Sequence, residues 1–186
     1  MRIAIIAEGP IDFEVSEIFL RKVQIVSPTD QEPVRLPLTQ LPLRKHLKAL
    51  SGRQGDPLER VDKAIVLKDS GSSTCQQVVS GLQQQIAGAN WPFPVKLGSA
   101  VREIESWLLA DNQALSNITR LPCNPIYNPE SIQDPKQVLR NILERASPRQ
   151  DYGLDKAREI ADRMNLQIAR SNCPSLDHFI NSAHDC

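Results

Sequence analysis

The sequence predicts an α/β protein built on a parallel sheet with helices on both faces. Short apolar runs rich in Ile and Val alternate along the chain with stretches whose apolar residues recur at helical spacing. Strands that alternate with helices are joined by right-handed crossovers, which set the strands parallel and cover both faces of the sheet. The length of 186 residues suits one domain, so we expect no more than one active site.

The first half of the chain contains two clear buried strands. The run R-I-A-I-I-A at 2–7 is apolar and is stopped by the turn residues E-G-P. The helix expected at 11–22 carries acids in its first turn, where the helix dipole favours them. Residues 34–38 include a proline and follow another, so they are predicted as an edge strand or a loop. A helix is expected at 43–50, and K-A-I-V-L at 63–67 is the second buried strand.

The second half continues the alternation and then becomes helical. The patterns predict, in order, a helix at 75–87, a strand at 95–98 and helices at 103–111, 135–146, 152–167 and 175–183. Four prolines space out a loop between residues 122 and 135. We therefore expect an α/β core over residues 1–120 and a helical C-terminal extension over 121–186 that packs on the same domain.

Composition excludes several classes of function. The chain has 22 Lys and Arg against 22 Asp and Glu, so a polybasic or histone-like binding mode has no support. Aromatic residues make up 4%, too few for a single-strand binder that relies on a platform of stacked rings. One basic run contains no acid and consists of Arg35, Arg44, Lys45, Lys48 and Arg53. Such a run is more typical of a solvated helix face than of nucleic-acid contact.

The cysteines and the N-terminus indicate the compartment. Cys75, Cys123, Cys173 and Cys186 lack the paired spacing of zinc or thiol redox sites, so we expect reduced thiols. The apolar run at the N-terminus is too short for the core of a signal peptide or for a membrane span. The sequence therefore predicts a cytoplasmic protein that does not associate with a membrane.

Two acidic residues follow predicted strands. Glu8 comes directly after the first strand, and Asp69 follows the central strand after one intervening residue, Lys68. Ligands of open parallel sheets bind at the carboxyl ends of the strands, and Mg²⁺ takes carboxylate oxygens together with water and phosphate. The pair predicts a Mg²⁺ site, although acids at strand ends also occupy turns and cap helices.

A third acidic stretch is V-R-E-I-E-S-W-L-L-A-D at 101–111. On a helix, Glu105 falls within a mostly apolar arc, and a buried carboxylate needs a metal, a cation or hydrogen-bond donors. A structural ion pair with a basic side chain is therefore as plausible as a metal. Glu103 is expected on another face near Trp107 and Asp111, and Trp107 suits core packing better than base stacking. Arg102 is expected to pair with Ser106 or Glu105.

Five segments together carry a family resemblance. They are E-G-P-I-D at 8–12, K-D-S-G-S-S-T-C at 68–75, R-E-I-E-S-W-L-L-A-D at 102–111, D-P-K at 134–136 and S-L-D-H-F at 175–179. In this order along nearly the whole chain they resemble a bacterial TOPRIM-like family of formerly unknown function, which includes AriB, the nuclease effector of the PARIS anti-phage system.

The resemblance implies a TOPRIM fold in which a Glu after the first strand and a D-x-D after a later strand hold Mg²⁺ or Mn²⁺ to cleave phosphodiesters. Members often work beside an AAA-type ATPase that acts as a sensor. By position the metal ligands are Glu8 and Asp69, with Glu105 assisting catalysis. The other motif residues are Gly9, Asp12, Glu103, Trp107 and Asp111.

Three positions depart from the family pattern. Gly71 stands where the second Asp of the D-x-D is expected, Thr74 replaces a common further Asp, and Ile11 replaces a usual Thr. The loss of one acid removes an oxygen ligand and a negative charge, so one-metal chemistry is expected in place of a two-metal arrangement. The sequence leaves open whether the target is DNA, tRNA or other RNA, and whether the chain forms a homo-oligomer.

The main alternative is a catalytically inactive TOPRIM-like subunit that binds a partner ATPase or a phosphate-bearing ligand. The hydroxyls of Ser72, Ser73 and Thr74 precede a predicted helix and suit a phosphate cradle, yet Ser73 also suits a capping box with Gln76. A serine or cysteine hydrolase is disfavoured because there is no G-x-S-x-G elbow and the chain offers as bases His46, His178 and His184 alone.

Overall fold

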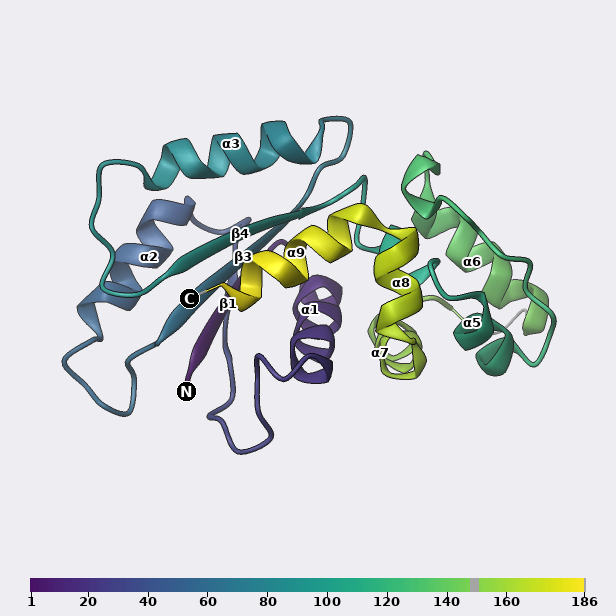
Figure 1. Cartoon of the computed structure of the whole chain (residues 1–186), viewed down its shortest axis with the longest axis horizontal. Coiled ribbons are helices and arrows are strands. Elements are labelled where there is room, and N and C mark those ends of the chain that lie inside the picture. Colours follow the sequence, from purple (N-terminus) through teal and green to yellow (C-terminus); the bar gives the residue numbers. More distant parts are fainter. Residues whose placement is uncertain (148–150, 186) are drawn as a thin grey trace.

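The computed structural model describes residues 1–147 and 151–185, and the predicted free thiol Cys186 lies outside them. The sheet has four parallel strands in the order β2-β1-β3-β4, which confirms the α/β prediction (Figure 1). The strands are β1 (Ile3–Ala7), β2 (Val34–Pro37), β3 (Lys63–Asp69) and β4 (Val95–Ala100). Pro33 and Pro37 predicted an edge strand or a loop, and β2 is a strand at an edge of the sheet.

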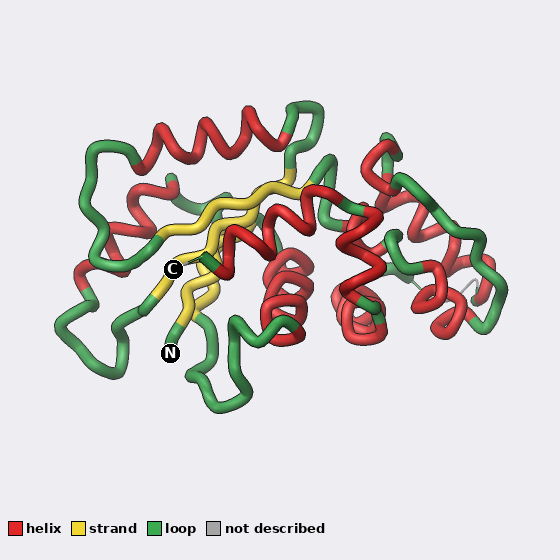
Figure 2. Tube along the Cα trace, in the orientation of Figure 1, coloured by secondary structure: helices red, strands yellow, loops and turns green. Residues whose placement is uncertain are grey.

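Helices lie above and below the strands, which run side by side in the left half of the view, and a further group of helices lies to the right (Figure 2). The helices are α1 (Pro10–Lys22), α2 (Leu43–Gly52), α3 (Cys75–Ile86), α4 (Glu105–Leu108), α5 (Asn112–Thr119), the 3-10 helix η1 (Pro129–Ser131), α6 (Pro135–Ala146), α7 (Leu154–Arg163), α8 (Leu166–Asn172) and α9 (Pro174–His184). Within the described residues, no helix is long and apolar enough to cross a membrane.

The two faces of the sheet bury separate apolar clusters. In β1, Ile3 and Ile5 face the cluster shared with α1 and α9, whereas Ala4 and Ile6 face the cluster beneath α2 and α3. Alternation of side chains along a strand sends consecutive residues to opposite faces, so a strand covered on both faces is apolar throughout. Helices α5, α6, α7 and α8 gather beyond the sheet on the side toward which β4 runs (Figure 1).

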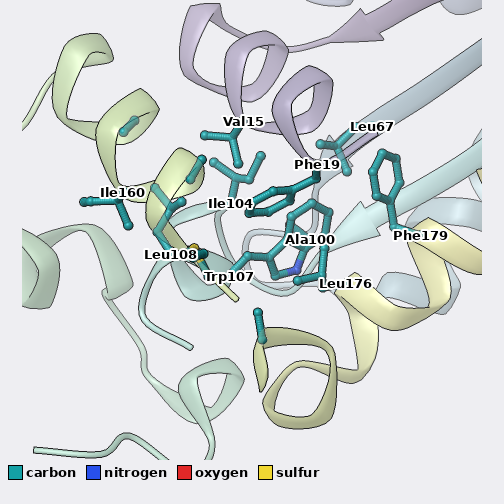
Figure 3. Close-up of a cluster of buried hydrophobic side chains, with 14 of the residues drawn as sticks. Val15, Phe19, Leu67, Ala100, Ile104, Trp107, Leu108, Ile160, Leu176 and Phe179 are labelled. Carbon is teal, nitrogen blue, oxygen red and sulfur yellow. The ribbon is translucent and has the colours of Figure 1, made fainter. Parts of the chain in front are cut away.

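Trp107 on α4 lies at the centre of the larger cluster, fully buried (Figure 3). Its ring centroid is 6.4 Å from that of Phe19 and 5.3 Å from that of Phe179. Its indole Nε1 donates a hydrogen bond of 2.8 Å to Ser175 Oγ. This environment agrees with the packing interpretation of Trp107, because a ring without exposed surface has no face on which a base could stack.

Helix α9 crosses β4 closely at Gly98. A Cβ built at Gly98 would lie 2.5 Å from Cδ2 of Phe179, well inside van der Waals contact. The absence of a side chain at Gly98 therefore allows the C-terminal helix to press against the sheet. Whether the chain divides at residue 120 into a core and an extension stays a prediction.

Three sequence predictions about helices are wrong in detail. The helix expected at 103–111 is one turn, α4, because the side chain of Asp111 caps a separate helix, α5. The helix expected at 152–167 divides into α7 and α8, since the side chain of Asn165 accepts the amides that begin α8. The capping box of α3 uses Thr74 and Gln77, one residue later than the expected pair.

Candidate functional site

Glu8 and Asp69 lie together at the carboxyl edge of the sheet. Glu8 follows β1, Asp69 ends β3, and these two strands are hydrogen-bonded neighbours. The backbone amide of Asp69 donates a hydrogen bond of 3.1 Å to Oε2 of Glu8. The topology therefore brings the side chain of Glu8 to the backbone of Asp69, which is 61 positions away in the sequence.

Asp12 stands beside this pair, on the first turn of α1. Its Oδ2 accepts a hydrogen bond of 2.8 Å from the amide of Gly9 and thereby caps the helix. Burial raises the pKa of Asp12 to about 6, and the carboxylates of Glu105 and Glu8 add to the rise against the opposing effect of the Gly9 bond. Asp12 consequently titrates closer to neutrality than an exposed aspartate does.

Asp69 is the most perturbed acid of this edge. Its Oδ1 is buried and has no hydrogen-bond partner within the described parts of the chain. The pKa of Asp69 is raised to about 9. Burial is the largest cause of this rise, and the negative charges of nearby acids add to it, in the order Asp12, Glu105, Glu8 and Glu103. We refer to Glu8, Asp12, Asp69, Glu103 and Glu105 as the acidic cluster. An unpartnered buried oxygen among four other acids is costly in the absence of a cation.

Glu105 projects from α4 and is 3% exposed. Its Oε1 lies 3.6 Å from Nζ of Lys136 on α6, so the ion pair left open by the sequence is formed. The charge of Lys136 also opposes the rise that burial causes in the pKa of Asp12 and of Glu103. Burial, followed by Glu105, raises the pKa of Tyr152, which keeps its phenol protonated next to the cluster.

Glu103 occupies the outer rim of the cluster. Burial is the main cause that raises the pKa of Glu103, and the charge of Glu105 adds to the rise. It lines a small cavity of about 240 Å³ together with Gly71, Arg102, Gln133 and Asp134. The charged groups that act on the pKa of Glu103 are Glu105, Lys136 and Asp134, and its expected place near Trp107 and Asp111 stays a prediction.

Arg102 supports the loop after β3. Its backbone amide donates a hydrogen bond of 2.8 Å to Oγ of Ser70, and its Nη1 lies 3.5 Å from the carbonyl oxygen of Gly71. The expected pairing of Arg102 with Ser106 or Glu105 is therefore wrong. Gly71 has a φ of +55°, a conformation that glycine adopts without the strain of a side chain.

Asp111 is not part of the acidic cluster. Its Oδ1 accepts the amides of Gln113 and Ala114 at the start of α5, and its Oδ2 accepts the amide of Asn165 at 2.8 Å. These three hydrogen bonds hold the start of α8 against the start of α5. The aspartate is 2% exposed and satisfies backbone donors, which is a structural task.

The loop that contains Ser72, Ser73 and Thr74 is exposed. Thr74 caps α3 by accepting the amide of Gln77 at 3.2 Å, while the amide of Ser73 is used in a turn with Ser70. The hydroxyls of Ser72 and Ser73 make no hydrogen bond to residues that the structure describes. The structure thus leaves these two hydroxyls available in the loop that follows Asp69.

The basic run is partly neutralised. Arg35 is paired with the buried carboxylates of Glu14 and Glu17, at 3.1 and 2.8 Å. Arg53 lies 3.7 Å from Glu59. Three members remain exposed on α2, namely Arg44, Lys45 and Lys48. His46 on the same helix is buried, with Nε2 3.1 Å from the carbonyl oxygen of Pro37, so it packs beneath this face.

The acidic cluster fits a divalent cation held by few protein ligands. In residues 1–147 and 151–185, no group of three or more His, Cys, Asp or Glu side chains is arranged to hold a metal ion. Glu8 and Asp69 nevertheless offer adjacent carboxylates, one with an unpartnered oxygen. Mg²⁺ commonly takes one or two carboxylates and completes its coordination with water and substrate phosphate.

Residues 11–182 match the family described as "Domain of unknown function (DUF4276)". The chain belongs to this family. No curated protein matches the sequence. Among solved structures, the C-terminal region of the Burkholderia pseudomallei OLD protein is similar over 98% of both chains, with 11% sequence identity and a TM-score of 0.44. The similarity is too distant to carry a function to this DUF4276 chain.

Two residues of the site escaped the sequence reasoning. Lys136 is part of the D-P-K segment, but a lysine at the start of a helix gave no sign that it pairs with Glu105. Tyr152 lies more than 40 positions beyond the acids whose charges raise its pKa. In this DUF4276 chain both reach the acidic cluster through helix packing, which a local pattern does not record.

Proposed function

We propose that this protein is a Mg²⁺- or Mn²⁺-dependent, TOPRIM-like nuclease that hydrolyses phosphodiesters of a nucleic acid. The observation that carries the proposal is the unpartnered, buried Oδ1 of Asp69 next to Glu8, among three further acids. A hard cation would satisfy that oxygen and offset the accumulated negative charge. The five-segment resemblance supports the TOPRIM assignment and a role as a cytoplasmic effector of anti-phage defence beside an AAA-type ATPase.

The residues divide the work by position. Glu8 and Asp69 would hold the ion, which when bound polarises a phosphate and lowers the pKa of a water molecule. Glu105 would assist through its charge, which acts on Asp69 and Asp12, while Lys136 pairs with its carboxylate. Gly71 contributes no ligand where the family has an acid, so the proposal is limited to one metal ion.

A second candidate is a catalytically inactive subunit that binds a partner ATPase or a phosphate-bearing ligand. Two observations favour it. Lys136 already neutralises Glu105. The described residues also contain no ready group of three metal ligands. In this case the free hydroxyls of Ser72 and Ser73 would bind the phosphate without a metal.

Metal titration and cleavage assays separate the two candidates. The full chain, alone and with an ATPase encoded beside it, is incubated with labelled DNA, tRNA and other RNA in Mg²⁺, in Mn²⁺ and in EDTA. Glu8→Gln and Asp69→Asn keep the shape of each side chain and remove its charge. Glu144→Gln, at an exposed position on α6, is the matched control.

For a nuclease, both site variants lose Mn²⁺ binding and at least a hundredfold of the cleavage rate, and the control keeps both. Unchanged cleavage in both site variants would refute the assignment of Glu8 and Asp69. Absence of metal binding in the wild-type protein, with phosphate binding that depends on Ser72 and Ser73, would establish the inactive subunit instead.

A further inference from the structure

A larger cavity than the one at Glu103 lies between α3 and the start of α9. It has a volume of about 570 Å³ and is lined by residues from α3, β4, η1 and α9. Pockets that bind small organic groups commonly enclose a few hundred cubic ångströms. None of the acidic cluster lines this cavity, so it is a separate site.

The cavity adjoins the acidic cluster through the sheet. Asp69 at the end of β3 is in register with Ala100 at the end of β4. The residues on either side of Ala100, Ser99 and Val101, line the cavity. Adjacent strands are about 4.8 Å apart, so one strand spacing separates the backbone of Asp69 from the wall of the cavity. A substrate with its phosphate at Asp69 would have a neighbouring group within reach of the cavity.

One carboxylate in the cavity is held in a fixed orientation. Oε1 of Glu130 accepts hydrogen bonds from the amide of Ser175 at 2.8 Å and from its hydroxyl at 2.6 Å. The same hydroxyl accepts the indole N–H of Trp107, which is anchored in the core. Oε2 of Glu130 makes no hydrogen bond or ion pair with the portion of the chain that is described. Glu130 thus presents a fixed, unused acceptor.

The remaining walls suit a flat ring with polar edges. Val79, Val101 and Pro174 provide apolar surface, and Gln83 and His178 provide polar groups at the margin. A nucleobase has two apolar faces and an edge of donors and acceptors. An exocyclic amino group on that edge would donate to a carboxylate oxygen, as such groups do in base recognition by Glu.

We propose that this cavity binds a nucleobase that carries an exocyclic amino group, with Oε2 of Glu130 as the acceptor for that group. The inference rests on the proposed function, because the base would belong to the nucleotide next to the cleaved phosphodiester. It adds a determinant of sequence preference that lies outside the metal site. The substrate is then single-stranded or locally unpaired at this nucleotide, since a paired base has its amino group engaged.

Binding is tested first without metal, which keeps it independent of cleavage. The full chain in EDTA is titrated with adenosine and with purine riboside, which lacks the amino group, and binding is followed by NMR shifts. Adenosine is expected to bind about tenfold more tightly, since a hydrogen bond to a charged acceptor contributes about that much. Equal affinity for the two nucleosides, or no binding of either, would overturn the proposal.

Two variant pairs locate the site. Glu130→Gln retains an acceptor for Ser175 and removes the charge, so the tenfold preference for adenosine should disappear; Glu144→Gln should retain it. Ser80→Trp places a bulky ring at an exposed position that lines the cavity, whereas Gln84→Trp places it on the same helix outside the cavity. Loss of binding in Ser80→Trp but not in Gln84→Trp supports the site, and equal effects of the two refute it.

Cleavage then separates this inference from the proposed function. If metal-dependent cleavage occurs with the same base preference in wild type and in Glu130→Gln, the nuclease proposal stands and the base pocket is wrong. If adenosine binds as described and no nucleic acid is cleaved under any condition, the pocket stands and the nuclease proposal fails.

Discussion

Replacing Asp69 by Asn should stabilise the metal-free protein. In the folded chain the pKa of this carboxyl is about 9, compared with an ordinary value of 3.8. Between these two pH values the folded state retains a proton that the unfolded state releases. The protonated carboxyl of Asp69 therefore makes its full contribution to the free energy of unfolding below pH 3.8, and this contribution is lost as the pH rises toward 9.

The size of the effect follows from that difference. Each pH unit above 3.8 costs the folded state about 1.4 kcal/mol, so the cost at pH 7 reaches about 4 kcal/mol. Asn has no proton to release and keeps nearly the same shape. We therefore expect Asp69→Asn to gain up to about 4 kcal/mol in free energy of unfolding at pH 7 in EDTA, while it loses metal binding.

Urea unfolding in EDTA at several pH values between 5 and 8 measures this directly. The wild-type free energy of unfolding should decline more steeply with pH than that of Asp69→Asn, and the difference in slope should approach the titration of one proton. Glu144→Gln should follow the wild type. Equal slopes for wild type and Asp69→Asn, or a variant less stable than wild type at pH 8, would refute the reasoning about Asp69.

Four further substitutions test the packing of the core and the cap of α3. Gly98→Ala places a Cβ 2.5 Å from the Phe179 ring and should cost about 1–3 kcal/mol in urea unfolding; an unchanged midpoint would contradict the close approach of α9. Trp107→Ala should cost about 3–5 kcal/mol by the same assay, and a loss below 1 kcal/mol would show that the ring is not central to the core. Thr74→Ala should lower stability by about 1 kcal/mol, whereas Ser73→Ala should leave it unchanged; the reverse order would restore the capping box predicted one residue earlier.

Much of the fold was predictable because its signals are local. The apolar runs in β1 and β3 are buried on both faces, so burial and β-propensity point to the same structure. The prolines around Val34 correctly indicated an edge strand. The limits of α4 were not predictable from periodicity, because the apolar pattern continues through Leu109 and Ala110 after the helix has ended at Leu108.

The candidate site was predictable only in part. The rule that ligands gather at the carboxyl ends of parallel strands correctly placed Glu8 beside Asp69. The family resemblance grouped Asp111 with the motif acids, but its carboxylate accepts hydrogen bonds from the backbone amides of Gln113, Ala114 and Asn165. Side-chain hydrogen bonds to distant backbone groups depend on how helices dock, and no local pattern encodes that docking.

By itself the sequence determined the alternation of strands and helices, the parallel direction of the strands in one sheet, and the edge of that sheet at which Glu8 and Asp69 meet. These properties follow from side-chain periodicity and chain connectivity, which act over a few residues. Only the tertiary structure decided that Asp69 holds an unpartnered buried oxygen, that Lys136 pairs with Glu105, and that Glu130 is fixed by Ser175 in a separate cavity. Burial and charge at a site depend on the sum of all neighbours, and those neighbours come from helices far apart in the chain.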